Sequence, residues 1–226
     1  MLAAIALIPS APVLVPELAG AAAAEVADLR AAALRAATEL PARWIAIGVG
    51  GVDEVIATSA VGTFAGYGTD IRVALSPDAD DPVAELPLAA LIAGWVRAQV
   101  NPGGAAEVRV YAEVGEAAVH RGRALRAELE ESPEPVGVLV VADGANTLTE
   151  SAPGGFDPDS VSTQTALDDA LAAGDTDAVI RWASGAVGES AYQVLAGLAG
   201  SQPVHAREFY RGAPFGVGYF AGTWHR

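Results

Sequence analysis

The chain has 226 residues, of which 52% are hydrophobic and 18% are charged, and its formal net charge is −15. This length is enough for a well-buried core, and the composition excludes a disordered chain and a coiled coil. The negative charge disfavours nucleic acid and anionic membrane surfaces as partners. Because there is no cysteine, a disulfide scaffold, a thiolate metal site and a cysteine nucleophile are also excluded.

The first 24 residues are apolar enough to raise the question of a signal peptide. They carry no basic residue, and Pro9, Pro12 and Pro16 interrupt them before an apolar helix could form. No uncharged stretch has the length and helical composition of a membrane span. The sequence therefore predicts a cytoplasmic protein.

Strands and helices alternate along the chain. An apolar run at residues 2–8 predicts a strand buried on both faces, and an Ala-rich amphipathic helix is expected over residues 18–40. Residues 57–69 are rich in Gly, Ser and Thr and predict a loop. The other expected strands lie at 43–49, 71–75, 107–111, 136–141, 204–211 and 216–223, and the other helices at 87–100, 116–131, from 157 or 159 to 173, from 175 onward and at 189–198.

This alternation predicts a three-layer α/β fold, with a mainly parallel sheet, helices on both faces and a C-terminal antiparallel hairpin. No internal repeat or linker divides the chain, so residues 1–226 are expected to form one domain. Ligands of such sheets bind at the carboxyl ends of the strands. That rule selects the loops at residues 9–17, 48–54 and 142–155.

Familiar motifs are missing from these loops. The glycines between Gly48 and Asp53 lack the dinucleotide-binding spacing, and there is no G-x-S-x-G nucleophile elbow. His120, His205 and His225 are too scattered for a zinc site, although His205 could face a pocket.

Carboxylates remain as candidate ligands in the third loop. Asp143 directly follows a buried strand, and Glu150, Asp157 and Asp159 come soon after it. These groups could hold a hard cation through oxygen ligands. The alternative is that Asp143 braces a tight turn with Gly144, while Asp157 and Asp159 cap a helix.

Four segments of the sequence resemble the LigB-like superfamily of class III extradiol ring-cleavage dioxygenases, over nearly the whole chain. The opening strand runs into a proline-rich segment at residues 8–17, and Ala-Asp-Gly-Ala-Asn at 142–146 is similar to the Gly-Asp-x-Ser-His turn of active members. The segments at 153–157 and 213–220 resemble an actinobacterial branch of these proteins.

The resemblance implies an Fe(II) site of two histidines and a glutamate, with a further histidine as acid and base. In this sequence Ser10 stands at the first histidine ligand, Val49 or Gly50 at the second, and Asn146 at the acid/base histidine. Glu189 is near the position of the glutamate ligand. A hydroxyl and a glycine do not replace two imidazoles, so the usual iron site is expected to be lost.

We therefore expect a LigB-like fold that has no cofactor. It is expected to bind a small molecule or a protein partner at the cleft where the active members of the superfamily have their active site. The residues expected to line this cleft are Ser10, Gly50, Asp143, Asn146, Glu189 and His205. The alternative is an active extradiol dioxygenase, with Fe(II) or another divalent metal held by Asp143, Glu189 and His205. A structural component of a homo- or hetero-oligomer is a third possibility.

Overall fold

The centre of the protein is a seven-stranded sheet in the order β3-β7-β2-β8-β1-β10-β9, in a computed structural model that describes residues 1–225. The four middle strands run parallel, and antiparallel strands complete both edges. The strands are β1 (Leu2–Ile8), β2 (Arg43–Val49), β3 (Glu54–Ile56), β7 (Ala105–Tyr111), β8 (Val136–Val141), β9 (His205–Gly212) and β10 (Tyr219–His225). The predicted parallel centre and C-terminal hairpin are confirmed.

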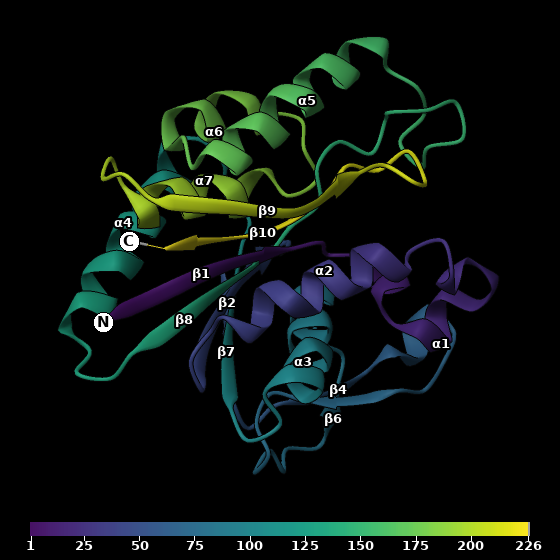
Figure 1. The fold of residues 1–226 in the computed structure, drawn as a ribbon. Coiled ribbons are helices and arrows are strands. Elements are labelled where there is room, and N and C mark those ends of the chain that lie inside the picture. Colours follow the sequence, from purple (N-terminus) through teal and green to yellow (C-terminus); the bar gives the residue numbers. More distant parts are fainter. Residues whose placement is uncertain (226) are drawn as a thin grey trace.

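Helices cover both faces of this sheet, as Figure 1 shows. One face carries α2 (Ala27–Thr38) and α3 (Leu88–Val100), and the other carries α4 (Glu116–Glu131), α5 (Pro158–Ala173), α6 (Thr176–Trp182) and α7 (Glu189–Ala199). All six residues of β8 are buried, because helices pack against it from above and below. The predicted three-layer α/β architecture is confirmed.

Two glycines let α4 and α7 cross at very short range. A Cβ atom on Gly122 would lie 2.0 Å from the backbone oxygen of Val194, and one on Gly197 would lie 2.1 Å from that of Val119. No side chain fits into such a gap, so the two helices pack backbone against backbone. This crossing fixes the second half of α7 against α4.

The helix expected over residues 18–40 is broken in the structure. Only α1 (Pro16–Ala19), the 3₁₀ turn η2 (Gly20–Ala23) and α2 form there. Gly20 has φ 53° and ψ −124°, a conformation that ends α1 and that glycine adopts without steric cost. Arg30 then holds the break, since its guanidinium donates to the backbone oxygens of Leu14 and Ala23.

Residues 57–69 contain regular structure, so the prediction of a plain loop was wrong. A three-stranded sheet of order β5-β4-β6 forms from β4 (Val61–Thr63), β5 (Arg72–Ala74) and β6 (Val83–Ala84), and the 3₁₀ turn η3 (Phe64–Tyr67) follows β4. Its strands are too short to show a period of two in the sequence. Within residues 1–225, no helix has the length and apolar character needed to cross a membrane.

Candidate functional site

The loop after β8, residues 142–146, is held by hydrogen bonds to several separate segments of the chain, and we refer to it as the β8 loop. It lies at the carboxyl edge of the parallel strands, where ligands bind in open α/β sheets. Its partners include residues of the segment after β1, of α5, of the turn before α7 and of the turn before β10, among them Ser10, Gln164, Val187, Gly188 and Gly218. The β8 loop is therefore a rigid junction between these elements.

Asp143 is the titratable residue of the β8 loop, and it is only 9% exposed. Its Oδ1 atom accepts the backbone hydrogen of Ser10 at 2.7 Å, whereas Oδ2 has no hydrogen-bond partner among residues 1–225. Burial raises the pKa of Asp143 to about 7, although the Ser10 amide opposes this rise. Burial raises the pKa of the Tyr192 and Tyr219 phenols above their usual value, and the negative charge of Asp143 is the second cause of this rise.

Gln164 connects the β8 loop to α5. Its Oε1 atom accepts the backbone hydrogen of Ala145 at 2.7 Å, and its Nε2 atom donates to Oδ1 of Asp168 at 2.8 Å. Burial raises the pKa of Asp168 to about 6, and the hydrogen bond from Gln164 is the main influence that opposes the rise. A chain of hydrogen bonds thus runs from the β8 loop into the side of α5.

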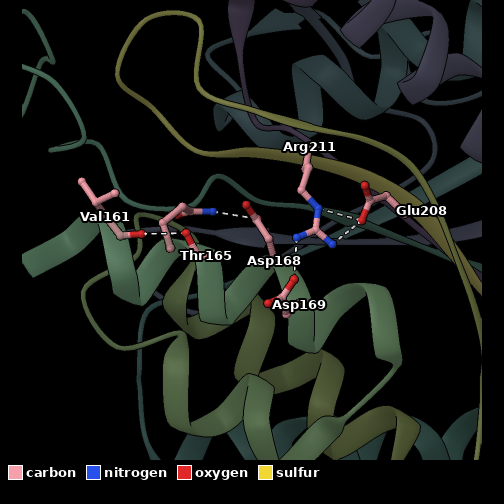
Figure 2. A network of polar contacts seen from close by, with 7 residues as sticks. Val161, Thr165, Asp168, Asp169, Glu208 and Arg211 are labelled. Atoms are coloured by element: carbon pink, nitrogen blue, oxygen red, sulfur yellow. Dashed lines mark hydrogen bonds and ion pairs between the residues drawn. The ribbon is translucent and has the colours of Figure 1, made fainter.

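A neighbouring ion pair joins α5 to the edge strand β9. Figure 2 shows Arg211 of β9 facing Asp168 and Asp169 of α5. Arg211 forms ion pairs with Asp169 and with Glu208, each at 2.6 Å. These contacts are partly exposed and fasten α5 over the C-terminal hairpin.

A cavity of about 240 Å³ opens on the α5 side of the β8 loop. Ala145 and Thr147 form one wall, the first turns of α5 form a second, and residues 182–186 close the third side. Trp182 lines this cavity and is 37% exposed, while Trp44, Trp95 and Trp224 are buried. Because drug-sized ligands fill roughly 300–1,000 Å³, this cavity fits a smaller molecule.

The polar groups at the α5 wall of this cavity are mainly hydrogen-bond acceptors. Oδ1 of Asp157 accepts the backbone hydrogen of Asp159 at 3.0 Å, which caps α5; the other carboxylate oxygens of this pair have no partner within the described chain. Ser160 and Thr163 donate their hydroxyl hydrogens to backbone oxygens, so only their lone pairs face outward. No Lys, Arg or His of residues 1–225 lines this cavity.

The structure brings five of the six predicted cleft residues to the carboxyl edge. Ser10 follows β1, Gly50 follows β2, and Asp143 and Asn146 belong to the β8 loop. The backbone hydrogen of Gly50 is donated to Tyr111 O at 3.2 Å, and a Cβ atom there would lie 2.7 Å from Val110. Gly50 therefore has a packing role where its strand meets β7.

Glu189 uses its carboxylate within the fold. It begins α7, and its two carboxylate oxygens accept hydrogen bonds from Gly185 N and from Gln193 Nε2, at 3.0 and 3.1 Å. Asn146 lies against Gly154, whose backbone hydrogen is donated to the backbone oxygen of Asn146 at 2.9 Å. The carboxylate of Glu189 is therefore not free to bind a ligand.

His205 lies at the opposite edge of the sheet. It is exposed, it begins β9, and it pairs in register with His225, which adjoins the amino-terminal half of β1. Because β10 runs antiparallel to β1 and β9 runs antiparallel to β10, β9 has the same direction as the parallel strands, and its first residue lies at their amino edge. The predicted ligand set of Asp143, Glu189 and His205 is therefore not assembled, and His205 does not line the cleft.

The donor set also does not fit the iron site that the resemblance implies. Among the described residues, no three His, Asp or Glu side chains lie close enough together to hold a metal ion. The structural alternative for the acidic residues is confirmed for Asp157, which caps α5, whereas Asp159 lies in the first turn of α5 without capping it. Asp143 accepts a hydrogen bond from Ser10, so the expected brace of a tight turn with Gly144 was wrong.

Comparison with known proteins supports the fold. A crystal structure of an uncharacterised protein, JW3007, from Escherichia coli K12 has a similar fold, with a TM-score of 0.58 over 98% of this chain and 99% of that chain. The two sequences are 11% identical, so the likeness shows the fold alone. No family model and no curated protein matches the sequence. The resemblance to LigB-like proteins stays a prediction.

Two residues of the candidate site have no signal in the sequence. Gln164 lies in the middle of α5, and a glutamine ordinarily faces solvent, yet it is buried at the β8 loop. Trp182 is the last residue of a short helix, and its apolar side chain would be expected in the core. Only the spatial meeting of α5, α6 and the β8 loop gives them a common surface.

Proposed function

We propose that this protein binds a small molecule at the carboxyl edge of its sheet, in the cavity between the β8 loop, α5 and residues 182–186. The observation that carries the proposal is the position of this cavity at the edge where ligands of α/β sheets bind. Trp182 lines it on one side, and the β8 loop, held by the hydrogen bond from Ala145 N to Gln164, lines it on another. The scaffold is LigB-like in this proposal, and the iron centre of that superfamily is absent from it.

The cost of burying Asp143 supports the same location. A largely buried carboxyl that accepts one hydrogen bond lowers the stability of the fold near neutral pH, and residues with such raised pKa values are concentrated at functional sites. Asp143 lies two residues before Ala145, which lines the cavity. In this proposal Asp143 fixes the position of the β8 loop through its hydrogen bond with Ser10.

Another hollow of about 300 Å³ lies between β7 and α4, away from the β8 loop. Its charged side chains already satisfy one another: Arg109 binds Glu107 and Glu128, and Arg121 binds Asp53. A ligand there would have to replace these ion pairs. The cavity beside Trp182 has unpaired polar groups instead and is the better candidate.

The test is a fragment screen by protein NMR, with a library that contains cationic, neutral and anionic compounds in equal parts. The expected result is that binding fragments shift the amide signals of Ala145 and Thr147 and the indole signal of Trp182. A Ser184→Phe variant places a ring in the cavity wall and should abolish these shifts while the fold is retained. Fragments that bind only elsewhere, or not at all at millimolar concentration, would show the proposal to be wrong.

A further inference from the structure

The side-chain amide of Gln164 is held in one orientation by its two partners. The backbone N–H of Ala145 can only donate, and the ionised carboxylate of Asp168 can only accept. The amide oxygen Oε1 therefore faces Ala145 at 2.7 Å, and Nε2 faces Asp168 at 2.8 Å. Gly144 and Gly218 lie against the same amide, where a Cβ atom on either glycine would overlap it.

This amide is part of the wall of the cavity. Gln164 and Ala145 both line the cavity, and Gln164 is only 7% exposed. Since Gln164 belongs to α5 and Ala145 to the β8 loop, the hydrogen bond between them joins two walls of the cavity. If this bond breaks, the two walls are free to separate.

The strength of this junction depends on the ionisation of Asp168. The side chain of Asp168 is buried, and the hydrogen bond from Gln164 is the one that its carboxylate accepts within the described residues. A carboxylate accepts a hydrogen bond roughly twice as strong as one between neutral groups. It also polarises the amide, so that Oε1 becomes a better acceptor for the Ala145 hydrogen. When Asp168 takes up a proton, both hydrogen bonds of Gln164 are weakened.

The titration of Asp168 leads to the same relationship. Burial raises the pKa of Asp168 to about 6, and the hydrogen bond from Gln164 is the main influence that lowers it. Because this hydrogen bond favours the ionised form, ionisation in turn favours the state in which the hydrogen bond is made. The junction is therefore strongest above pH 6, and it weakens as the pH falls through that value.

Four other charged or titratable side chains interact electrostatically with Asp168: Arg211 and Glu208 of β9, Asp169 of α5 and Tyr192 of α7. Arg211 lowers the pKa of Asp168, whereas Glu208 and Asp169 raise it. The pKa of the Tyr192 phenol lies well above its ordinary value of 10, so this group stays neutral while Asp168 titrates. These side chains set the pH at which the junction weakens, and none of them hydrogen bonds to Gln164.

We propose that protonation of Asp168 loosens the cavity wall, because the ionised carboxylate is what keeps Gln164 bonded to Ala145. This regulation concerns the same cavity and in that sense rests on the proposed function. A ligand that needs the closed wall should bind more weakly below pH 6 than above it.

The test is hydrogen exchange of the Ala145 amide, followed by NMR and corrected for the intrinsic exchange rate, between about pH 5 and pH 7.5. The Gly218 amide is the matched control, since it donates to the backbone oxygen of Ala145 at 2.8 Å and uses no side chain. Protection of Ala145 relative to Gly218 should rise about fivefold over this range. Its midpoint should equal that of the Asp168 carboxyl, measured by carbon-13 NMR.

Three variants assign this change in protection. Asp168→Asn keeps an acceptor for Gln164 but cannot ionise, so the pH dependence should vanish. Asp143→Asn removes the other buried carboxyl near the β8 loop and should retain it, while Arg211→Met should move its midpoint to higher pH. Constant relative protection in the unmodified protein, or a pH dependence that persists in Asp168→Asn, would overturn the inference.

The test needs no ligand, so the two proposals fail separately. A negative exchange result removes the pH dependence of the wall and leaves the proposed binding function standing. A fragment screen without binding at this cavity removes the proposed function, whatever the exchange of Ala145 shows.

Discussion

The carboxylate of Asp143 accepts the backbone hydrogen of Ser10 at 2.7 Å, and 133 positions separate these two residues in the sequence. This single contact joins the loop after the first strand to the loop after β8. It is also the only hydrogen bond that the buried carboxylate receives within the described residues, which makes its ionisation expensive. The stability of the protein should therefore depend on pH through this residue.

Asp143→Asn is expected to stabilise the protein above pH 7. The folded-state pKa of about 7 lies above the ordinary value of 3.8, so the contribution of the neutral acid is complete below pH 4 and is lost as the pH rises through 7. The amide cannot ionise and still accepts the Ser10 hydrogen. We expect a gain of about 2–4 kcal/mol at pH 8 that disappears near pH 4, measured by urea unfolding.

The exposed Asp78 provides the control, because Asp78→Asn should leave this difference between pH 4 and pH 8 unchanged. If Asp143→Asn lowered stability at every pH, ionisation of the buried Asp143 carboxyl would not be what limits stability above pH 7.

Gln164→Leu should lower the free energy of unfolding by about 2–3 kcal/mol. The leucine fills the space but leaves the Ala145 backbone hydrogen and the Asp168 carboxylate without their partner. Thr165→Ala removes only an exposed hydroxyl that donates to Val161 O on the outer face of the same helix, and should change stability by less than about 0.5 kcal/mol. Equal effects of the two variants on the free energy of unfolding would show that the hydrogen bonds of Gln164 do not stabilise the β8 loop.

Arg211→Met should raise the pKa of Asp168 above its value of about 6, because Arg211 is one of the groups that lowers it. Carbon-13 NMR of the side-chain carboxyl measures this change directly. Since the ion pairs of Arg211 are partly exposed, stability should fall by less than about 1 kcal/mol. An unchanged Asp168 titration would mean that Arg211 does not contribute to the pKa of this carboxyl.

Gly122→Ala should be strongly destabilising, by about 3 kcal/mol or more, because its Cβ atom would overlap the backbone of α7. Gly103→Ala, where a Cβ atom meets nothing within 4 Å, is the matched control and should be close to neutral. Thermal unfolding followed by circular dichroism distinguishes the two. A well-tolerated Gly122→Ala would show that α4 and α7 separate easily.

Incubation with Fe(II) under anaerobic conditions, followed by desalting, is expected to leave no stoichiometric metal in plasma mass spectrometry. The reason is the donor set, in which both oxygens of Glu189 are engaged and His205 lies at the other edge. One equivalent of retained iron that Asp143→Ala removes would reverse this conclusion.

The fold could be predicted from the sequence where a pattern is long and local. The continuous apolar run of β8 and the amphipathic helix α4 have the predicted bounds, because burial of both faces or of one stripe leaves a clear period. Gly20 shows the limit, since its positive φ breaks a helix whose composition favours continuation. The short strand β6 was missed because two residues carry no period.

The part of the candidate site that could be predicted is the part that follows from ligand binding at the carboxyl ends of parallel strands. That rule placed Asp143 correctly at the carboxyl edge, since it depends on strand direction alone. His205 was misplaced because the edge at which the hairpin begins depends on the antiparallel pairing of β10 with β1, which no local pattern reveals. The cavity itself forms from three segments that are distant in sequence, and the role of Gln164 appears only when they meet.

The position of β1 has a consequence for synthesis of the protein. Its two neighbours in the sheet are β8 and β10, and both are made long after it. At roughly 5–20 residues per second, the apolar β1 waits on the order of 10 s for β8 and longer for β10. During that time both of its edges are unpaired, so the nascent chain is most exposed to aggregation and to chaperone binding before residue 136 emerges.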